Sequence, residues 1–469
     1  MIFLACLWLF ITGLGIAHWC MPSARFTEKA GLAFPVSAGL HGAVLFLLMQ
    51  SFLPSVWLTV LLFAPFLLPL RGLRFNQATA PLPGEDPLNC AGSTSISSAG
   101  HRPDGGPTTH PSGRAGWTVA ELIAILFVLF TAVQILVHVF FVPAIEWDAV
   151  AQWFLKGKAL TVDGKITADF TNWLQAQGLH PDYPWNVPLM YAWLSRAAGR
   201  FSEPACEAVV YAFYISLVLI LYSLARLRFR RPAALLALAI YLAIPGAVEH
   251  VLYRDADTIL ETYFAAVLFL VLRHQLVPAA KTVPLVAALV FLACWTKREG
   301  LVYCALLLVP WLAWLSLKRG TRGRLLLPAA AAIGSVLGIF AFWLPKTAFG
   351  VSTMFVPGPA AFQGISGEVH KLGTILYLMA KECLKVYRWN FTWLLPPFLL
   401  WFGRDRYGLR ILFLAHLLVY FFVYFLAPVD FRWHISTSWS RLLLHALPEL
   451  YAWTIFVAAE NLTARQPED

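Results

Sequence analysis

The sequence has little charge for its length. Only 13% of its 469 residues are Asp, Glu, Lys or Arg, whereas about 25% is usual in a soluble domain. Residues of the set AVILMFWYC make up 59%, and the mean hydropathy is +0.68. A soluble fold of this size cannot bury so much apolar surface. The composition therefore excludes a soluble enzyme, a secreted disulfide scaffold and a disordered regulator, and it predicts an all-α polytopic membrane protein.

Cysteine and cofactor motifs are also scarce. The seven cysteines are scattered, odd in number and without a CxxC pair. Several lie inside apolar runs, where cysteine usually acts as a small hydrophobic residue. They indicate neither a disulfide framework nor a metal site. The chain has no Walker loop, no GxGxxG before a helix and no metal-ligand spacing, so no cofactor is predicted and metal dependence stays open.

Basic residues exceed acidic ones, with 35 Lys and Arg against 25 Asp and Glu, which gives a formal net charge of +10. In a soluble protein this excess would indicate a nucleic-acid partner. In a membrane protein it is typical of cytoplasmic loops that set the topology. We therefore expect membrane lipid, and no nucleic acid, among the partners.

Thirteen apolar runs are candidates for membrane spans. A spanning helix needs about 20 residues, with roughly 17 as a minimum, so the shorter runs leave 11 to 13 spans. The first run has no basic residue before it, which favours a start-transfer helix with an external N-terminus over a cleaved signal peptide. The runs are 2–20, 37–52, 56–70, 119–142, 207–225, 233–249, 258–273, 282–294, 300–317, 325–345, 390–403, 409–427 and 442–459.

The positions of the basic residues give an independent test of orientation. If the clusters between runs are cytoplasmic, all thirteen runs alternate without conflict and the C-terminus is inside. The clusters are Arg25 and Lys29; Arg71 and Arg74; Arg226, Arg228, Arg230 and Arg231; Arg273 and Lys281; Lys318, Arg319, Arg322 and Arg324; and Arg404, Arg406 and Arg410. The external loops are then 143–206, 250–257, 295–299, 346–389 and 428–441. These loops carry the unusual polar clusters, so we expect the functional site on the outer face.

Composition also divides the chain into segments. Residues 1–75 hold three N-terminal helices, and 76–118 are rich in Gly, Pro, Ser and Thr. That second segment is predicted to be a disordered cytoplasmic linker. Residues 119–459 form the main helical body, and 460–469 form a cytoplasmic tail.

The first external loop opens with Glu146-Trp147-Asp148. A carboxylate at the membrane surface beside a tryptophan can act as a general base. Alternatively, Asp148 caps the amphipathic segment that follows it. Later in the loop, His180 and Tyr183 lie in the proline-flanked segment H-P-D-Y-P. Such residues suit a carbohydrate or head-group surface, although an interfacial aromatic belt is the alternative.

The second external loop contains the sequence Y-R-D-A-D, with Asp255 and Asp257 two residues apart. This spacing resembles the DxD metal motif of nucleotide-sugar enzymes, but it is common by chance. Asp257 also stands at a suitable position to cap the helix that follows.

Two further clusters carry cations. In W-T-K-R-E-G, Lys297 and Arg298 could hold a lipid phosphate beside Glu299, since charges at bilayer depth need a partner. The alternative is a cytoplasmic turn next to the weak span 282–294. The last external loop, from Asp430 to Arg441, includes Arg432 and His434. Arg441 could bind phosphate, or it could snorkel toward the interface.

In this order, the segments E-W-D, H-P-D-Y-P, Y-R-D-A-D, W-T-K-R-E-G and W-H-I-S-T-S-W-S-R-L-L resemble one family. The chain is similar to the bacterial branch of the GT-C membrane glycosyltransferases, which are related to protein O-mannosyltransferases and the lipid A aminoarabinose transferase. The resemblance covers residues 119–459. The H-P-D-Y-P segment departs from the tyrosine-proline forms of the best-known members, which puts acceptor details in doubt.

The resemblance implies a GT-C fold and an inverting transfer of a sugar from a polyprenyl-phosphate donor to an acceptor hydroxyl on a glycolipid, polysaccharide or protein. By the family pattern, Asp148 is the catalytic base. Lys297, Arg298, Arg432 and Arg441 are then candidates to bind the donor phosphate. Candidates for the acceptor or sugar are Glu146, His180, Tyr183, Asp255, Asp257, Glu299 and His434. The family branch also implies a bacterial inner membrane, with the site facing outward.

Two other functions remain open at this point. A transporter or flippase of a lipid-linked sugar would need charged groups deep in the helices, and the apolar runs are notably poor in acids. A non-catalytic subunit of an envelope glycan assembly complex would use the same loops to bind a partner.

Overall fold

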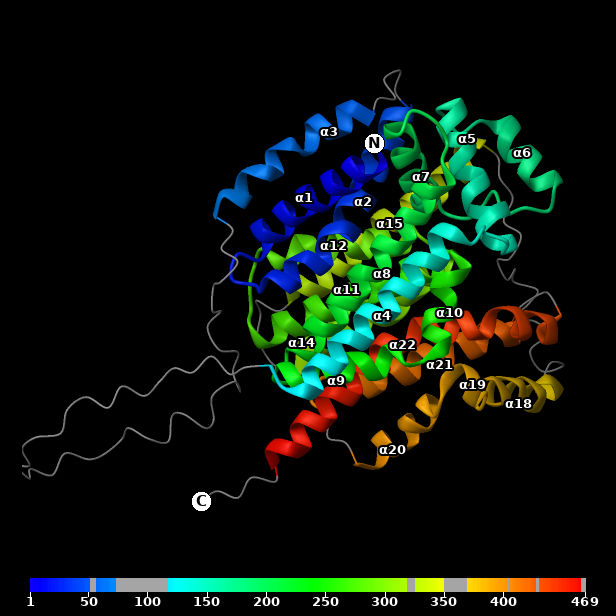
Figure 1. The fold of residues 1–469 in the computed structure, drawn as a ribbon. Coiled ribbons are helices and arrows are strands. Elements are labelled where there is room, and N and C mark those ends of the chain that lie inside the picture. The colour runs from blue at the N-terminus through cyan, green and yellow to red at the C-terminus, as the bar shows by residue number, and fades with distance from the viewer. Residues whose placement is uncertain are drawn as a thin grey trace, which may run out of the picture.

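A computed structural model describes residues 1–50, 56–72, 117–318, 325–349, 369–402, 405–426 and 430–464. Throughout these residues the regular secondary structure is helical, without a strand (Figure 1). The predicted linker 76–118 lies outside the described residues except for its last two positions. The prediction of an all-α polytopic membrane protein is confirmed, because many of these helices are long and apolar enough to cross a bilayer.

Nine helical segments in the described part of the chain meet the length and composition of a membrane span. They are α1 (Ile2–Cys20), α2 (Phe26–Gln50), α4 (Val119–Phe141), α8 (Glu203–Ala225), α11 (Asp257–Leu276), the continuous segment of α13 (Arg298–Val302), the π-helical turn η3 (Tyr303–Leu308) and α14 (Val309–Lys318), then α15 (Leu326–Phe349), α21 (Leu409–Leu426) and α22 (Phe431–Ala464). A tenth span is formed if α9 (Arg231–Leu242) and α10 (Pro245–Tyr253), which meet at an angle of 63°, cross together.

Three further apolar segments are shorter helices: Val56–Leu70, Thr282–Cys294 and Thr392–Trp401. The first comprises α3 (Val56–Phe63) and most of η1 (Ala64–Gly72), the second is α12 (Thr282–Cys294), and the third joins η6 (Thr392–Leu394) to α20 (Leu395–Phe402). Each of the thirteen apolar runs therefore overlaps a helix.

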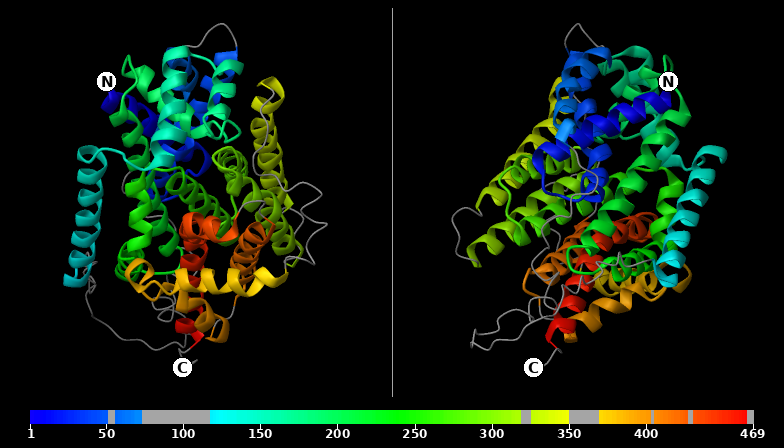
Figure 2. Two further views of the ribbon diagram at one scale, coloured as in Figure 1. Left: turned by 90° about the vertical axis from the view of Figure 1, so that its right-hand side faces the viewer. Right: turned by 60° about the vertical axis from the view of Figure 1, so that its left-hand side comes forward.

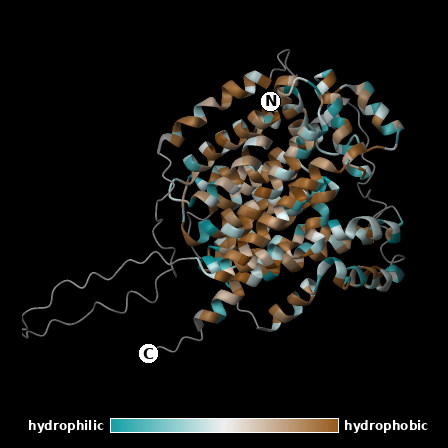
Figure 3. Cartoon of the chain, in the orientation of Figure 1, coloured by the Kyte–Doolittle hydropathy of each residue, from teal (hydrophilic) through white to brown (hydrophobic). Residues whose placement is uncertain are grey.

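The helices differ in how deeply they are buried. In the most apolar stretch of α11, 94% of the residues are buried, against 22% in α4. Helix α11 has the lowest hydropathy of these spans and carries Asp257, Glu261 and Arg273, so a position inside the bundle keeps these side chains away from lipid. Figure 1 shows α11 at the centre of the molecule. Helix α4 stands at the edge of the molecule in Figure 2, and Figure 3 shows hydrophobic residues along most of the central helices.

The N-terminal helices pack directly on the main body. The hydroxyl of Tyr263 on α11 donates to the carbonyl of Pro35 on α2 at 3.2 Å. The Nε of Arg273 pairs with Glu28 at 3.0 Å, and both side chains are buried. The first three helices thus contribute to the same buried core as residues 119–459.

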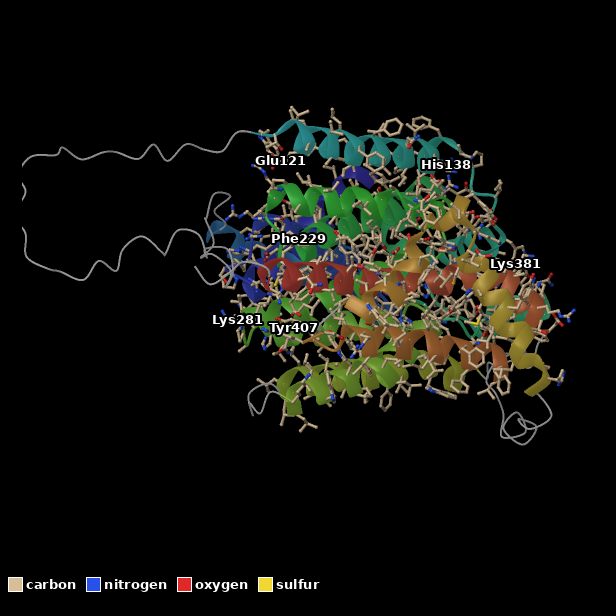
Figure 4. All side chains as sticks on the ribbon, turned by 90° about the horizontal axis from the view of Figure 1, so that it is seen from below. Glu121, His138, Phe229, Lys281, Lys381 and Tyr407 are labelled. Carbon is tan, nitrogen blue, oxygen red and sulfur yellow. The ribbon has the colours of Figure 1, made fainter. Side chains whose placement is uncertain are left out.

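The bundle has two distinct ends. Figure 4 shows Glu121, Phe229, Lys281 and Tyr407 at one end, which we call the linker end. At the other end, which we call the site end, the same view shows His138 and Lys381. The site end also carries short helices between the spans: the π-helical η2 (Asp148–Phe154), α5 (Leu155–Asp163), α6 (Ala168–Ala176), α7 (Asn186–Ala197), α18 (Leu372–Cys383) and α19 (Val386–Trp389).

At the linker end, an ion pair holds the start of α4. The guanidinium of Arg231 contacts the carboxylate of Glu121 at 2.5 Å and lies 4.1 Å from the centre of the Trp117 ring. Thr118 and Glu121 cap the helix reciprocally, which satisfies its first backbone N–H groups.

One predicted loop is wrong. We expected residues 428–441 to form an external loop, but α22 already begins at Phe431. The cause is local, since the carboxylate of Asp430 accepts a hydrogen bond from the backbone N–H of Trp433 at 2.8 Å and caps the helix. Arg432, His434 and Arg441 therefore lie on one helix, and helical periodicity decides which of them can meet.

Helices α1 and α2 cross at a contact that only glycine allows. A Cβ at Gly13 would lie 1.8 Å from the carbonyl oxygen of Ala33. Replacing Gly13 with alanine must push the helices apart, so we expect Gly13→Ala to lower stability by about 1–3 kcal/mol. Thermal unfolding of the detergent-purified protein measures the change. Gly373→Ala on α18 is the control, because a Cβ there meets nothing within 4 Å. Equal unfolding temperatures for the two variants would contradict the tight crossing.

Candidate functional site

The turn between α10 and α11 is fixed by Arg254. Its backbone is in the left-handed region, with φ of 56°. The Nη2 atom donates to the carbonyls of His138 at 2.8 Å and Val139 at 3.1 Å, and also to the carbonyl of Val142. They lie in the last turn of α4 and just after it, where carbonyls are left without a following helical turn, although the His138 carbonyl also accepts from the N–H of Val142. Arg254 therefore ties the end of α4 to the start of α11.

Asp255 and Asp257 follow on this turn with different roles. The Asp255 carboxylate accepts from the backbone N–H of Asp257 at 2.9 Å. The predicted cap by Asp257 is wrong, because Asp257 is already the first residue of α11, and the Asp255 carboxylate binds its N–H. The Asp257 carboxylate is fully buried and instead lies 2.6 Å from the Nζ of Lys297 and 3.0 Å from the Nε2 of His445.

Asp255 has a polar neighbour of its own. The Nδ1 of His250 lies 3.8 Å from its carboxylate. Burial, and then the charge of Asp257, raise the pKa of Asp255 to about 6. The two aspartates thus bind separate protein partners.

The cations of the site converge on these carboxylates from other helices. Arg441, on α22, forms an ion pair with Asp148, which lies 293 residues earlier. The same Nη1 atom is 3.9 Å from the second oxygen of Asp257. Lys297, just before α13, also lies 3.5 Å from Glu299. We call Asp148, Asp257, Lys297, Glu299 and Arg441 the charge cluster.

Two features of the charge cluster bear on its chemistry. Although burial alone would lower it, the carboxylates of Asp257 and Glu299 hold the pKa of Lys297 above its usual range, so the lysine stays charged. Asp148 opens the π-helical turn η2, a wide turn that is frequent at functional sites. Its side chain keeps 31% of its surface exposed, so the carboxylate is accessible from outside the bundle.

A column of aromatic rings lies beside the charge cluster. The rings of His180 and Tyr183 are stacked 4.6 Å apart, and Trp153 stacks on Tyr183 at 5.7 Å. Arg298 covers Tyr183 at 5.3 Å and forms an ion pair with Asp182. We call Trp153, Tyr183 and His180 the aromatic column. Trp153 is buried, whereas His180 and Tyr183 are partly exposed, so the exposed parts of these two rings are suited to contact the apolar side of a sugar ring.

The charges nearby set the protonation of this column. Burial, followed by the cations Arg298 and Lys156, lowers the pKa of His180 to about 4. Burial raises the pKa of Tyr183 to about 12, and the charges of Lys297, Glu299, Asp148 and Arg441 also act on its phenol. At neutral pH the column is therefore uncharged, while it borders the charge cluster.

Lys156 is a buried ammonium enclosed by aromatic rings. Its Nζ donates to the carbonyl of His180 at 2.5 Å and lies 5.8, 5.5 and 5.4 Å from the ring centres of Trp153, Tyr183 and Trp185. Cation–π contacts of this kind partly replace lost hydration. Burial lowers the pKa of Lys156 to about 7, with a further contribution from Arg298.

Several predicted site residues do not join the charge cluster. Arg432 precedes Arg441 by nine residues, which on a helix is about half a turn away, so it faces the opposite side. It is exposed, and its guanidinium lies near Phe431. Glu146 is exposed, and its charge acts on Tyr253. His434 packs against Tyr424, with ring centres 4.9 Å apart.

The sequence motifs did not indicate a buried polar chain that lies on α21 and α22. His445 meets the hydroxyl of Tyr420 at 3.2 Å, and His416 meets Glu449 at 3.2 Å. The rings of Tyr420 and His416 are 4.5 Å apart. The signal was present, because Arg441, His445 and Glu449 recur every four residues and so share one helix face.

The buried polar residues of α21 and α22 also correct the expectation that the spans are poor in acids. Glu449 is 1% exposed within α22. Glu261, within α11, is fully buried and accepts a hydrogen bond from Tyr241. Ionisable residues at such depth are costly and are usually functional.

No group of three or more His, Cys, Asp or Glu side chains converges as a metal site among the residues that the structure describes. No protein-family model matches the chain, and neither a curated protein nor a solved structure matches it.

The ammonium of Lys156 gives a prediction about pH. In the unfolded chain a lysine titrates near 10.5, whereas the pKa of folded Lys156 is about 7. Between these values the unfolded state binds more protons, so stability rises with pH. Relative to Lys156→Met, which lacks the group, the wild type should gain on the order of a few kcal/mol from pH 7 to pH 10.

Unfolding temperatures of both proteins across this pH range measure the difference. Lys165→Met removes an exposed lysine from the turn after α5 and serves as the control. A constant difference between the wild type and Lys156→Met at every pH would show that Lys156 stays charged when buried.

Proposed function

We propose that the chain is a membrane glycosyltransferase that moves a sugar from a polyprenyl-phosphate donor to an acceptor hydroxyl of an envelope glycolipid, polysaccharide or protein. The observation that carries the proposal is the ion pair between Asp148 and Arg441. This pair and Lys297 lie beside the aromatic column, so a partly exposed carboxylate and two strong cations are close together there. A general base, a phosphate site and a sugar platform are the three parts that this reaction requires.

The phosphate of the donor fits the cations of the charge cluster. Arginine binds phosphate oxygens in a bidentate manner, and lysine adds a point charge. The buried carboxylate of Asp257 forms an ion pair with Lys297, which fixes the position of the lysine ammonium. As the bond between the sugar and the phosphate breaks, negative charge grows on the leaving phosphate, and pre-positioned cations stabilise that charge.

Asp148 is the proposed base. The acceptor oxygen attacks the anomeric carbon, its proton passes to the carboxylate, and the electron pair of the broken C–O bond leaves with the polyprenyl phosphate. Attack from the side opposite the leaving group inverts the anomeric configuration. The uncharged rings of Tyr183 and His180 provide a surface on which the sugar or acceptor can lie.

The ion pair also suggests the order of binding. Without substrate, the Asp148 carboxylate occupies Arg441, where a donor phosphate oxygen would bind. The guanidinium already faces the carboxylates of Asp148 and Asp257, so a phosphate would add a third negative charge, which is repelled by the other two. Donor binding then displaces the carboxylate and frees it to accept the acceptor proton, so the donor binds first.

The remaining parts of the proposal concern architecture. We propose a GT-C fold with up to thirteen spans, in which the bent pair α9–α10 and the three shorter apolar helices complete the crossings. The location of Lys281 at the linker end, away from the site, supports a cytoplasmic linker end and an outward-facing site (Figure 4). The proposed location is a bacterial inner membrane.

The exchange at Arg441 makes a two-part prediction for Asp148→Asn. Transfer should be abolished, because an amide cannot accept the proton. Binding of polyprenyl phosphate should become about fivefold tighter, since a competing anion worth about 1 kcal/mol is removed. Radiolabel release from purified polyprenyl-phosphate sugars tests the first part, and equilibrium binding of polyprenyl phosphate tests the second.

Glu146→Gln is the matched control. Glu146 lies two residues before Asp148, its side chain is exposed, and the substitution removes the same negative charge. It should leave polyprenyl-phosphate affinity unchanged. Retained turnover by Asp148→Asn would remove Asp148 from the role of base. Absence of any donor cleavage by the wild type, with membrane extracts as acceptors, would overturn the transferase.

A second candidate function has one observation in its favour. The His416–Glu449 pair and the buried Glu261 place ionisable groups inside spans, as proton-coupled transporters do. The chain would then carry a lipid-linked sugar across the membrane.

Glu449→Gln separates the two functions. If the chain is a transferase, sugar release should stay within about threefold of wild type, because the variant keeps the size and polarity of a side chain that lies outside the charge cluster. A transporter would lose proton-coupled movement of a fluorescent polyprenyl-phosphate sugar in vesicles. Loss of movement without any sugar release would favour the second function.

A further inference from the structure

A second basic site lies at the outer edge of the bundle. A hollow of about 540 Å³ opens where the start of α3 meets the end of α5 and the turn after α7. Arg196 and Arg200 line it, together with the apolar side chains of Trp57, Val162 and Phe201. It shares no residue with the charge cluster or the aromatic column.

Glycines position both arginines. Gly164 has φ of 74°, and a Cβ there would lie 2.6 Å from the Nη2 of Arg196, so only glycine lets this guanidinium reach the end of α5. Gly199, with φ of 86°, ends α7, and the N–H of Arg200 donates to the carbonyl of Ser195 at 3.1 Å. This helix-ending motif fixes the backbone at Arg200 and therefore the direction in which its side chain projects.

The hollow is cationic. Its described lining has two arginines and no Asp or Glu. Lys158 is outside this lining but near it, with its Nζ 6.0 Å from the centre of the ring of Phe201, a lining residue. Two guanidinium groups next to an ammonium indicate a phosphate ligand.

An apolar surface leads away from the hollow. Trp57, at its rim, is 62% exposed, and Leu61, one turn further along α3, is 68% exposed. Residues four apart share a helix face, and Leu68 continues the apolar surface on η1 at 60% exposed. A cationic hollow above an exposed apolar face matches a molecule with a phosphate head and hydrocarbon chains.

We propose that the hollow binds the phosphate of an anionic membrane phospholipid, with its acyl chains lying along Trp57, Leu61 and Leu68. The lipid would cover the outer surface of α3 and join it to α5 and α7. This site is independent of the proposed transfer reaction.

The test measures which phospholipids remain on the full-length protein. The chain is purified in a mixture of phosphatidylglycerol and phosphatidylcholine, washed, and its bound lipids are quantified by mass spectrometry. The wild type should retain phosphatidylglycerol preferentially. The double variant Arg196→Gln/Arg200→Gln should retain about fivefold less, because both charge-assisted contacts are lost.

Two further variants make the result specific. Lys165→Gln/Lys381→Gln removes two exposed lysines outside the hollow and should retain the wild-type amount. Trp57→Ser/Leu61→Ser keeps the arginines but lacks the apolar surface, so it should also lose phospholipid. Should the arginine variant fail to fold, Arg196→Lys/Arg200→Lys replaces it, with an intermediate loss expected because lysine lacks the bidentate fork.

Four outcomes would overturn the proposal. The first is an equal loss of phosphatidylglycerol in the lysine control. The second is equal retention of phosphatidylcholine by the wild type. The third is full displacement of the lipid by soluble glycerol phosphate, with no effect of Trp57→Ser/Leu61→Ser, which would assign the hollow to a free phosphate compound. Preferential retention of polyprenyl phosphate would likewise contradict the phospholipid.

Discussion

A carboxylate without exposed surface, Asp257 at the start of α11, constrains the arrangement of the whole site. A charge buried in a helical bundle must be paired, because an unpaired one costs several kcal/mol. Asp257 therefore requires Lys297 and His445 beside it, and these come from different helices. Arg441 lies one turn from His445 on α22, so it is brought close as well, and Asp148 completes the group.

The same pairing explains why the site is both rigid and responsive. The contacts of Asp257 and Lys297 are buried, so they hold the backbone of α11, α13 and α22 in register. The contact between Asp148 and Arg441 is partly exposed, and exposed ion pairs are weak. One charge network thus contains a buried, fixed part and a partly exposed, weaker part.

Apolar runs predicted the helices well, since a run of hydrophobic residues is sufficient to specify a buried or lipid-facing helix. The site was harder. Asp148, Lys297 and Arg441 were identified, but Arg432 was grouped with them because its segment was expected to be a loop, and a helix places it on the opposite side. His445 could have been found from its spacing to Arg441. Lys156 could not, because its aromatic surroundings come from packing among separate segments.

Helix α4 is the most lipid-exposed of the spans described, yet both of its ends are fastened. Arg231 grips Glu121 at one end, and Arg254 holds three carbonyls at the other. A helix held at both ends resists sliding along its axis and rotation about it, even where its side chains contact only lipid. Asp148 follows six residues after Val142, so the contact at this end also limits where its carboxylate lies in the bundle. The length of α4 between these two contacts therefore fixes the distance from the Arg231–Glu121 pair to the segment that carries Asp148.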